Sequence, residues 1–450
     1  MSVAPRIARF ALNRLGYGPR PGSIDEVLSR GTERWVQDQL RPGDDPIDAR
    51  VANFPALGYT IAQWVQLFNN DRNTYNAAVR DHLSAHFVRA VHGRNQLVEV
   101  LTDFWFNHFN VFGGEVLVRY GLTRYEQDTI RPHVLGRFRD LLGAVAGSWA
   151  MMTYLDNYLS TARNINENYA RELMELHTMG VDGGYTQRDV EEVTRAFTGW
   201  GIDFQGGGFL FRASSHDNGP KTVLGQTLVP GQGQKDGFDV LDILTRHRST
   251  AQFISMKLCR RFVADDPPES IVTRAADTFT RTNGNLRDVM RTILGSAEFW
   301  SEAFGPGKLK TPREFAVSAL RAVGAEIADA RSLSLDDLGQ PTFLALDPTG
   351  WSDRGADWLP NPGSHLARMN FALRLVSQAQ NGISIDLRNL IGGADQNDAS
   401  AATGAVNWHV FGDTLPANVI AACEGARGTG LPAAFKAVGV ALSSPAFQVK

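Results

Sequence analysis

Hydrophobic and polar positions alternate at helical spacing along most of the chain. The clearest case runs from Glu167 to Met179, a stretch without proline that we predict to be an amphipathic helix. A glycine cluster from Gly180 to Gly184 predicts where this helix ends, and Thr186 with Asp189 predicts the cap of the next one. The recurring positions are Ala170, Leu173, Met174, Leu176 and His177.

The same periodicity covers residues 74–112 and much of the chain after residue 235. Ser23 with Glu26 predicts a capping box near the N-terminus, and Pro312 suits the first turn of another helix. Residues 201–234 differ, because short apolar runs alternate with glycines there and predict a small β-hairpin or an irregular insertion.

These patterns predict a mainly α fold, a large multi-helix domain with roughly fifteen or more helices. We expect an N-terminal helical part over 1–200, the glycine-rich insertion over 201–234 and a C-terminal helical part over 235–450, together forming one integrated domain. The insertion is expected to cover the polar face of the 167–179 helix.

Composition excludes several classes of protein. The net charge of -3 and the absence of a basic run argue against a nucleic-acid partner. Two cysteines cannot build a disulfide framework or a thiolate zinc site, and no apolar stretch is long enough for membrane insertion. The N-terminus lacks a clean signal peptide, so the chain as it stands is expected in the cytoplasm; a periplasmic or secreted location follows if a signal peptide was removed.

The polar face of the 167–179 helix is the first candidate site. Asn168, Glu172 and Glu175 fall at i, i+4 and i+7 and share one face, with Arg171 beside them. Such a ladder is often only a solvated face held by weak ion pairs. The combination of two acids, an amide, an arginine and His177 before a glycine-rich bend favours a functional interpretation.

The stretch FWFNHFN is the second candidate. Asp103, Asn107 and Asn110 share a helical face, and His108 is adjacent. Its aromatic residues, Trp105 among them, are typical of a core, whereas an amide and an imidazole in that setting need hydrogen-bond partners when buried.

Two loops add further candidates. The first, HDNGPK, carries His216, Asp217 and Lys221 within six residues and reads either as a ligand contact or as plain turn chemistry. The second, in a proline-rich segment, places Trp351 and Trp358 where they line a pocket or form the loop's own small core.

Familiar catalytic signatures are missing from the sequence. It has no P-loop, no GxGxxG after a strand, no GxSxG and no HExxH. His177 follows Glu175 by two residues, which departs from the Glu-x-x-His spacing of di-iron bundles.

Several of these segments resemble one bacterial family. LNRLGYGPRPG, FWFNHFNV, NENYARELMELHTMGVDGGYTQRDV through FTGW, HDNGPKTVLG, KLCRRFVADDPP, KTPREF and DPTGWSD occur in the order found in the family called domain of unknown function 1800. The resemblance covers nearly the whole chain. Its name implies little about activity, and some members resemble exported proteins with signal sequences.

The first functional hypothesis is a hydrolase that cleaves a glycan or oligosaccharide with a carboxylate acid/base pair and no cofactor. Glu172 and Glu175, or one of them with Asp217 or Asp103, would supply the two carboxylates. The residues expected to contact the substrate are Asn107, His108, Asn168, Arg171, His177, His216, Lys221, Trp105, Trp200 and Trp351.

Two alternatives stay open. In a metal-dependent enzyme, hydrolytic or oxidative, His108, His177 and His216 with a carboxylate would bind one divalent metal ion. In a non-catalytic binding or assembly protein, the same polar motifs would be buried structural networks.

Overall fold

The computed structural model describes residues 3–305, 307–330, 333, 335–359, 362–377, 381–393, 395–426 and 430–450. These residues form 22 α-helices, several short 3₁₀ segments and three two-stranded antiparallel sheets. The predicted mainly α fold with small hairpins is therefore confirmed.

The N-terminal part of the chain is entirely helical. α2 does not have the predicted capping box, because Gly22 precedes it and the Ser23 hydroxyl instead accepts a hydrogen bond from the Arg20 amide at 3.3 Å. α6 is the longest of these helices and begins where Asp71 caps the Thr74 amide at 3.1 Å. The helices are α1 (Val3–Arg14), α2 (Ser23–Arg30), α3 (Thr32–Leu40), α4 (Ile47–Val51), α5 (Ile61–Asn70), α6 (Arg72–His92) and α7 (Gln96–His108).

The middle of the chain contains shorter elements and two β-hairpins. The predicted helix over 167–179 is present but ends early, at Glu175, and the predicted Thr186–Asp189 capping box is confirmed at the next helix. The elements are α8 (Val116–Arg124), the π-helix η2 (Tyr125–Ile130), α9 (Phe138–Ala146), α10 (Trp149–Tyr154), α11 (Asn168–Glu175), α12 (Gln187–Phe197), β1 (Trp200–Ile202), β2 (Phe209–Phe211), β3 (Lys221–Val223) and β4 (Gln226–Leu228).

The C-terminal part returns to helices. α18 starts with the predicted proline in its first turn, and Thr311 and Glu314 complete a capping box around it. The elements are α13 (Lys235–Arg246), α14 (Arg248–Phe262), α15 (Glu269–Arg281), α16 (Leu286–Leu294), α17 (Ala297–Ser301), α18 (Pro312–Ala322), β5 (Glu326–Ile327), α19 (Pro362–Val376), β6 (Ile383–Ser384), α20 (Ala399–His409), α21 (Ala417–Glu424) and α22 (Ala433–Ser443).

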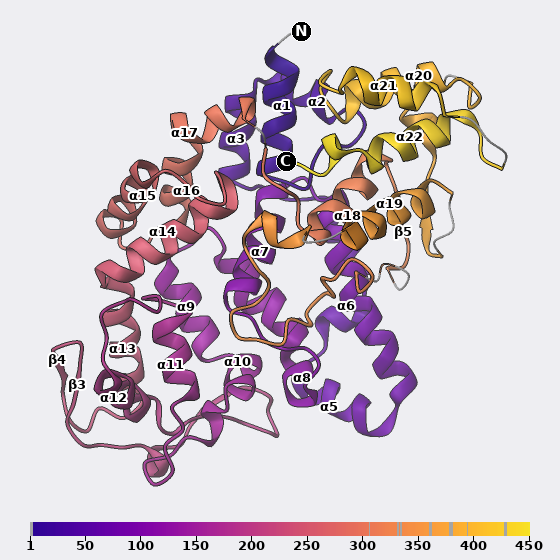
Figure 1. Ribbon diagram of the computed structural model, residues 1–450. Helices are drawn as coiled ribbons and strands as arrows, with labels where there is room; N and C mark the ends of the chain where they lie inside the picture. The colour runs from indigo at the N-terminus through magenta and orange to yellow at the C-terminus, as the bar shows by residue number, and fades with distance from the viewer. Residues whose placement is uncertain are drawn as a thin grey trace.

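Helices from the two ends of the chain pack on one another. α3 packs on α16, α6 packs on α18, and a β-bridge pairs Leu309 with Val449. In Figure 1, α7 lies near the middle of the view, between the column α13–α17 and the group containing α5, α6 and α18–α22. Every residue of α18 is buried, so this helix lies within the core.

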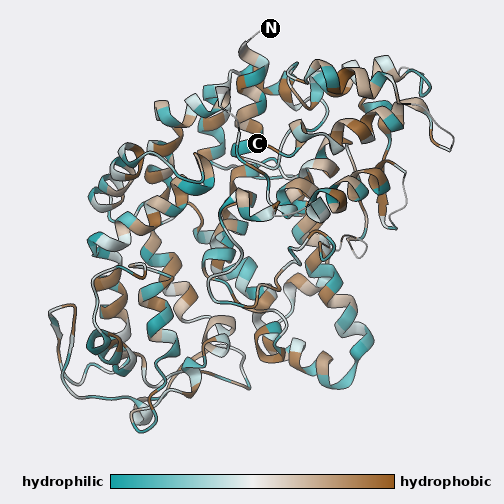
Figure 2. Cartoon of the chain, viewed as in Figure 1, coloured by the Kyte–Doolittle hydropathy of each residue, from teal (hydrophilic) through white to brown (hydrophobic). Residues whose placement is uncertain are grey.

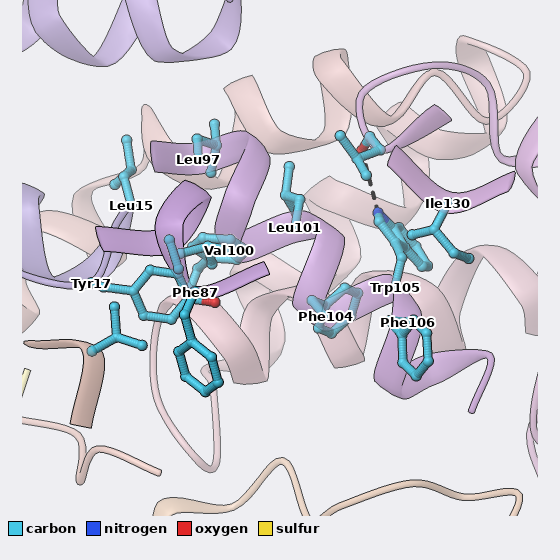
Figure 3. Packing of buried hydrophobic residues seen from close by; sticks show 14 of the residues in the cluster. Leu15, Tyr17, Phe87, Leu97, Val100, Leu101, Phe104, Trp105, Phe106 and Ile130 are labelled. Atoms are coloured by element: carbon cyan, nitrogen blue, oxygen red, sulfur yellow. Dashed lines mark hydrogen bonds between the residues drawn. The ribbon is translucent and has the colours of Figure 1, made fainter. Parts of the chain in front are cut away.

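The apolar face of α7 packs into that core. Figure 3 shows Leu97, Leu101 and Trp105 of this helix among buried side chains from other segments. The indole of Trp105 is fully buried, and its Nε1 donates a hydrogen bond to the Val134 carbonyl at 3.3 Å. The opposite face of α7 is therefore the one left to carry polar chemistry.

Hydrophilic and hydrophobic residues mix along the helices in Figure 2 rather than separating into wholly apolar segments. Within the described ranges, none of the helices combines the length and the apolar character that crossing a membrane requires.

Candidate active site

A small polar cavity lies against α7 and α18. Its volume is about 60 Å³, which is room for a few water molecules or one small chemical group. Distant segments of the chain meet there, including α6, α7, α14, α18, residues 340–353 and Lys450. Its walls carry the basic residues Arg261, Lys308, Arg313 and Lys450, the carboxylates Asp103, Glu314 and Asp353, and His86.

His86 is held by a buried carboxylate. Its Nδ1 lies 2.9 Å from Glu126 Oε1, and the second oxygen, Oε2, lies 2.7 Å from His82 Nε2. Because an ionised carboxylate only accepts hydrogen bonds, both histidines donate to Glu126. His86 Nε2 has no hydrogen-bond partner among the described residues, and the His86 side chain lines the cavity.

The π-helix η2 places Glu126 beneath these histidines. His82 and His86 are four residues apart on α6 and therefore share one face. Glu126 has no exposed surface, and the wider turn of the π-helix carries it there. π-helical turns often occur at functional sites, which agrees with this placement.

Electrostatics fix the protonation states of this pair. Burial alone would raise the pKa of Glu126, but His86 and His82 outweigh it and hold that pKa well below its ordinary value. Burial and then the nearby Arg313 lower the pKa of His86, with Glu126 opposing them. At neutral pH Glu126 is therefore ionised, and His86 is neutral with an unprotonated Nε2.

Arg313 forms the cationic part of the cavity. Its Nε lies 2.9 Å from Asp103 Oδ1 and 3.3 Å from the Tyr17 hydroxyl, and its backbone amide donates to Gln340 Oε1 at 2.9 Å. Its Nη1 has no hydrogen-bond partner in the described part of the chain. An arginine fixed at one end in this way presents a free N–H group to an anionic or developing negative oxygen.

A second charged cluster surrounds Glu314. Arg261 Nη2 lies 2.6 Å from Glu314 Oε1, and Lys450 makes a short ion pair with the same oxygen. Burial alone would raise the pKa of Glu314, yet Arg261 and Lys450 hold it below its ordinary value. This carboxylate is therefore ionised and already neutralised by its neighbours.

The segment 340–356 forms one wall and is attached to the end of α7. Asn107 exchanges two hydrogen bonds with the backbone of Trp351, at 2.8 and 2.7 Å. Asn110 donates to the carbonyls of Ala345 and Asp347, at 3.0 and 2.8 Å. The amides that the sequence placed on one helical face therefore hold a loop about 240 residues away in the chain.

The other side of this segment is held by charged groups. Lys257 Nζ lies 3.0 Å from Asp353 Oδ2, and Lys308 donates to the Asp353 carbonyl at 3.0 Å. Lys308 also pairs with Asp265, which accepts a hydrogen bond from the Gly355 amide at 3.0 Å. The wall is thus fixed at both ends.

Comparison with protein families gives a single result. The family described as "Protein of unknown function (DUF1800)" matches residues 10–449. The chain belongs to the DUF1800 family. No curated protein and no solved structure matches it.

Segments that carry the DUF1800 resemblance converge on the cavity. FWFNHFNV contributes Asn107 and Asn110, KLCRRFVADDPP contributes Arg261, KTPREF contributes Arg313, and DPTGWSD contributes Trp351. Sequence segments up to about 240 residues apart are therefore parts of one site, which makes this cavity the best candidate for the family's activity.

The structure places the predicted pair Glu172 and Glu175 elsewhere, half-buried on α11. The Tyr185 hydroxyl lies 3.4 Å from Glu175 Oε2. Burial and then Glu175 raise the pKa of Glu172, with Arg171 opposing them. Arg171 itself pairs with Glu167 at 3.0 Å, and Asn168 is exposed at the start of the helix.

The HDNGPK loop does not cover α11, contrary to our expectation. His216 Nε2 and Lys221 Nζ contact Asp236 Oδ2 of α13 at 3.2 and 2.7 Å, and all three side chains are buried. Asp217 accepts two hydrogen bonds from Arg195 of α12, at 2.8 and 3.1 Å, which lower its pKa to about 2. No hydrogen bond or ion pair among the described residues joins this loop to Glu172 or Glu175.

Two of the three tryptophans expected to contact the substrate lie in the core instead. Trp105 and Trp200 are 0% and 1% exposed, so neither indole has a face free to stack on a ligand. Trp351 differs, because it lines the cavity and packs against Trp358 with ring centroids 5.9 Å apart.

The alternative metal set is not assembled. His108 Nε2 donates to the His177 carbonyl at 3.1 Å, and the two rings lie 6.3 Å apart. His216 belongs to a different cluster, where Thr198 and Asp236 engage its two ring nitrogens. In the part of the chain that the structure describes, no group of three or more His, Cys, Asp or Glu side chains is placed to hold a metal ion.

His86, Glu126 and Arg313 were missed by the sequence analysis. The i, i+4 spacing of His82 and His86 in a helical stretch was the available signal, since two imidazoles on one buried face need a shared partner. No sequence signal marked Glu126 as that partner, because the π-helix shifts it out of the ordinary helical period.

Proposed function

We propose that this protein is a hydrolase that cleaves an ester bond in an anionic substrate, with His86 as the general base. The observation that supports it is that His86 lines the cavity while its Nε2 has no hydrogen-bond partner among the described residues. Its other nitrogen donates to the buried carboxylate of Glu126 at 2.9 Å.

In this proposal, His86 Nε2 removes a proton from a water molecule as the water attacks the ester. The imidazolium that forms is stabilised by the Nδ1–H hydrogen bond to ionised Glu126, which also fixes the tautomer. The proton then passes from Nε2 to the departing alcohol oxygen, so the base is restored. Glu126 stays ionised throughout.

Arg313 would stabilise the negative oxygen of the transition state. Arg313 lines the same cavity, its Nη1 has no partner in the described part of the chain, and Asp103 fixes the guanidinium from the Nε side at 2.9 Å. Arg313 keeps an N–H group without a partner among the described residues, which supports a substrate with an anionic group.

The test is hydrolysis of the anionic esters p-nitrophenyl phosphate and p-nitrophenyl sulfate by the wild type and by His86→Ala, with neutral p-nitrophenyl acetate as a comparison. We expect one of these esters to be cleaved, and the variant to lose about 10²- to 10⁴-fold in kcat/KM. His365→Ala, which changes an exposed histidine on α19, is the matched control. Equal rates for the wild type and His86→Ala would refute the proposal.

Glycan hydrolysis by a carboxylate pair is the second candidate. One observation favours it: burial and the neighbouring Glu175 raise the pKa of Glu172, as a general acid requires. Oligosaccharide cleavage that is lost in Glu172→Gln but retained in His86→Ala would favour this candidate over ester hydrolysis.

A further inference from the structure

A second, larger cavity lies at the C-terminal end of α18, whereas the candidate active site lies at the N-terminal end of that helix. It is a groove between α2, α3 and the turn that joins α6 to α7, with a volume of about 810 Å³. This volume is in the range of small-molecule binding sites. Arg20 and its neighbours at the end of LNRLGYGPRPG form one wall of the groove, whereas Tyr17 of the same segment contacts Arg313 in the candidate active site.

Arg321 brings an uncompensated positive charge to this groove. It is 3% exposed, and its guanidinium donates to the carbonyls of Gly18 at 2.8 Å and Val91 at 2.6 Å. No carboxylate of the described chain forms an ion pair with it. Burial and then Arg20 lower its pKa to about 9, and no acidic group opposes them. A buried cation without a counter-charge is costly, and a bound anion would offset that cost.

The other charges of the groove reinforce this imbalance. Arg30 is neutralised by Glu26 and Asp38, at 3.2 and 2.6 Å. Four other arginines line the groove, and none of them forms an ion pair with a described residue. Besides Glu26 and Asp38, the carboxylate that lines the groove is that of Asp44. Those arginines are Arg20, Arg41, Arg94 and Arg321.

The turn that carries Arg94 is fixed by side chains around it. Asp45 Oδ2 accepts hydrogen bonds from the amides of Arg94 and Asn95 at 2.7 and 2.9 Å, and Gln39 donates to the Arg94 carbonyl at 3.0 Å. His92 also lines the groove; among the described residues its Nε2 has no hydrogen-bond partner, and the carboxylate of Glu326 lies 3.8 Å from it. The groove is therefore preorganised and contains a free polar atom on a side chain that is only 7% exposed.

We propose that this groove is a binding site for a small molecule bearing two or more phosphate groups, recognised by Arg20, Arg94 and Arg321. Each phosphate presents three terminal oxygens, which suit guanidinium groups arriving from different elements. A carboxylate offers only two oxygens in one plane and suits a single guanidinium. This groove is separate from the candidate active site. Arg313 in the active-site cavity and Arg321 in the groove are eight residues apart on α18, or about 12 Å along the helix.

Calorimetric titration of the full chain with inorganic pyrophosphate at constant ionic strength tests this proposal. We expect saturable binding of one equivalent. Arg20→Ala and Arg94→Ala should each weaken it about tenfold or more, because each removes charge-assisted hydrogen bonds. Arg34→Ala, which removes an exposed arginine on α3 that does not line the groove, should bind like the wild type.

Thermal unfolding gives a second readout, because ligand that binds only the native state raises the melting temperature. Pyrophosphate should raise the melting temperature of the wild type and of Arg34→Ala, with a smaller rise in Arg20→Ala. Absence of saturable binding, equal affinity of Arg20→Ala and the wild type, or tighter binding of citrate than of pyrophosphate would each overturn the proposal. His86→Ala should bind pyrophosphate normally, so the outcome does not depend on the proposed ester hydrolysis.

Discussion

His86 donates a hydrogen bond from Nδ1 to Glu126 at 2.9 Å, and its Nε2 has no partner among the described residues. Buried polar groups are usually hydrogen-bonded, so a free ring nitrogen on a residue that lines a cavity together with Arg313 marks a place where a ligand would supply the missing partner. The same carboxylate also binds His82, and Arg131 lies 3.6 Å from it. Glu126 is thus fixed from three directions, and it fixes His86 in turn.

The first prediction concerns the pH dependence of ester hydrolysis. Burial and Arg313 lower the pKa of His86, so the ring stays neutral, and active as a base, to a pH below the ordinary value of 6.5. Activity should fall only as the pH drops through that lowered pKa. The acid limb of a kcat/KM profile should therefore lie below pH 6.5, and Arg313→Gln should move it upward. A limb above pH 6.5 would exclude His86 as the base.

The second prediction concerns Glu314 and stability. Glu314→Gln leaves Arg261 and Lys450 buried without their shared carboxylate, so we expect a loss of about 3–5 kcal/mol in the free energy of unfolding at pH 7. The folded pKa of Glu314 lies below its ordinary value of 4.5. Its stabilising effect is therefore fully present above pH 4.5 and is lost as the pH falls further.

Denaturant titrations at pH 7 and pH 4 measure this effect. The difference between the wild type and Glu314→Gln should shrink at the lower pH, where the wild-type carboxyl begins to lose its advantage. If the difference in the free energy of unfolding instead grows as the pH falls, the stabilisation by Glu314 does not come from its ion pairs with Arg261 and Lys450.

The third prediction concerns Gly350, which supports the wall of the cavity. Its φ of +71° suits glycine, and a Cβ atom there would lie 2.4 Å from the Asn107 carbonyl oxygen. Gly350→Ala should cost more than the roughly 1–3 kcal/mol of backbone strain alone, because the loop must also move away from α7. Gly339→Ala is the matched control, since φ is +83° there and nothing lies within 4 Å. Equal losses in the two variants would contradict this account.

The sequence predicted the fold well because local rules determine helices. The capping box at Thr186 and the proline start of α18 depend on residues within four positions of each other, and both are present. Ser23 does not cap α2, because its hydroxyl accepts a hydrogen bond from the Arg20 amide in the turn before the helix. The helix predicted over 167–179 ends at Glu175, where the α-helical bonding pattern stops: the amides of His177 and Met179 bond to carbonyls five residues back, those of Glu172 and Met174.

The candidate site was only partly predictable, since it depends on contacts across the whole chain. Asn107 and Trp351 were expected to contact a substrate, and both line the candidate active site. The amide of Asn107, however, is hydrogen-bonded to the Trp351 backbone, so it holds the cavity wall in place. His86 and Arg313 are more than 200 positions apart, so periodicity in either helix says nothing about the other. Long-range juxtaposition is therefore the part that one sequence does not supply.

The last prediction separates structural from catalytic roles in the HDNGPK loop. Lys221 and Asp236 are fully buried and 2.7 Å apart, so Lys221→Met leaves a buried carboxylate with only His216 as partner. We expect a loss of about 3–5 kcal/mol in the free energy of unfolding. Lys235→Met removes a comparable pair with Asp239, but that lysine is 59% exposed, so its loss should be at most about 1 kcal/mol. Ester hydrolysis should persist in folded Lys221→Met, because no hydrogen bond or ion pair between described residues joins this loop to His86. If Lys221→Met instead kept its stability and lost turnover, the loop would belong to the active site and the cavity at His86 would not be the place where the reaction occurs.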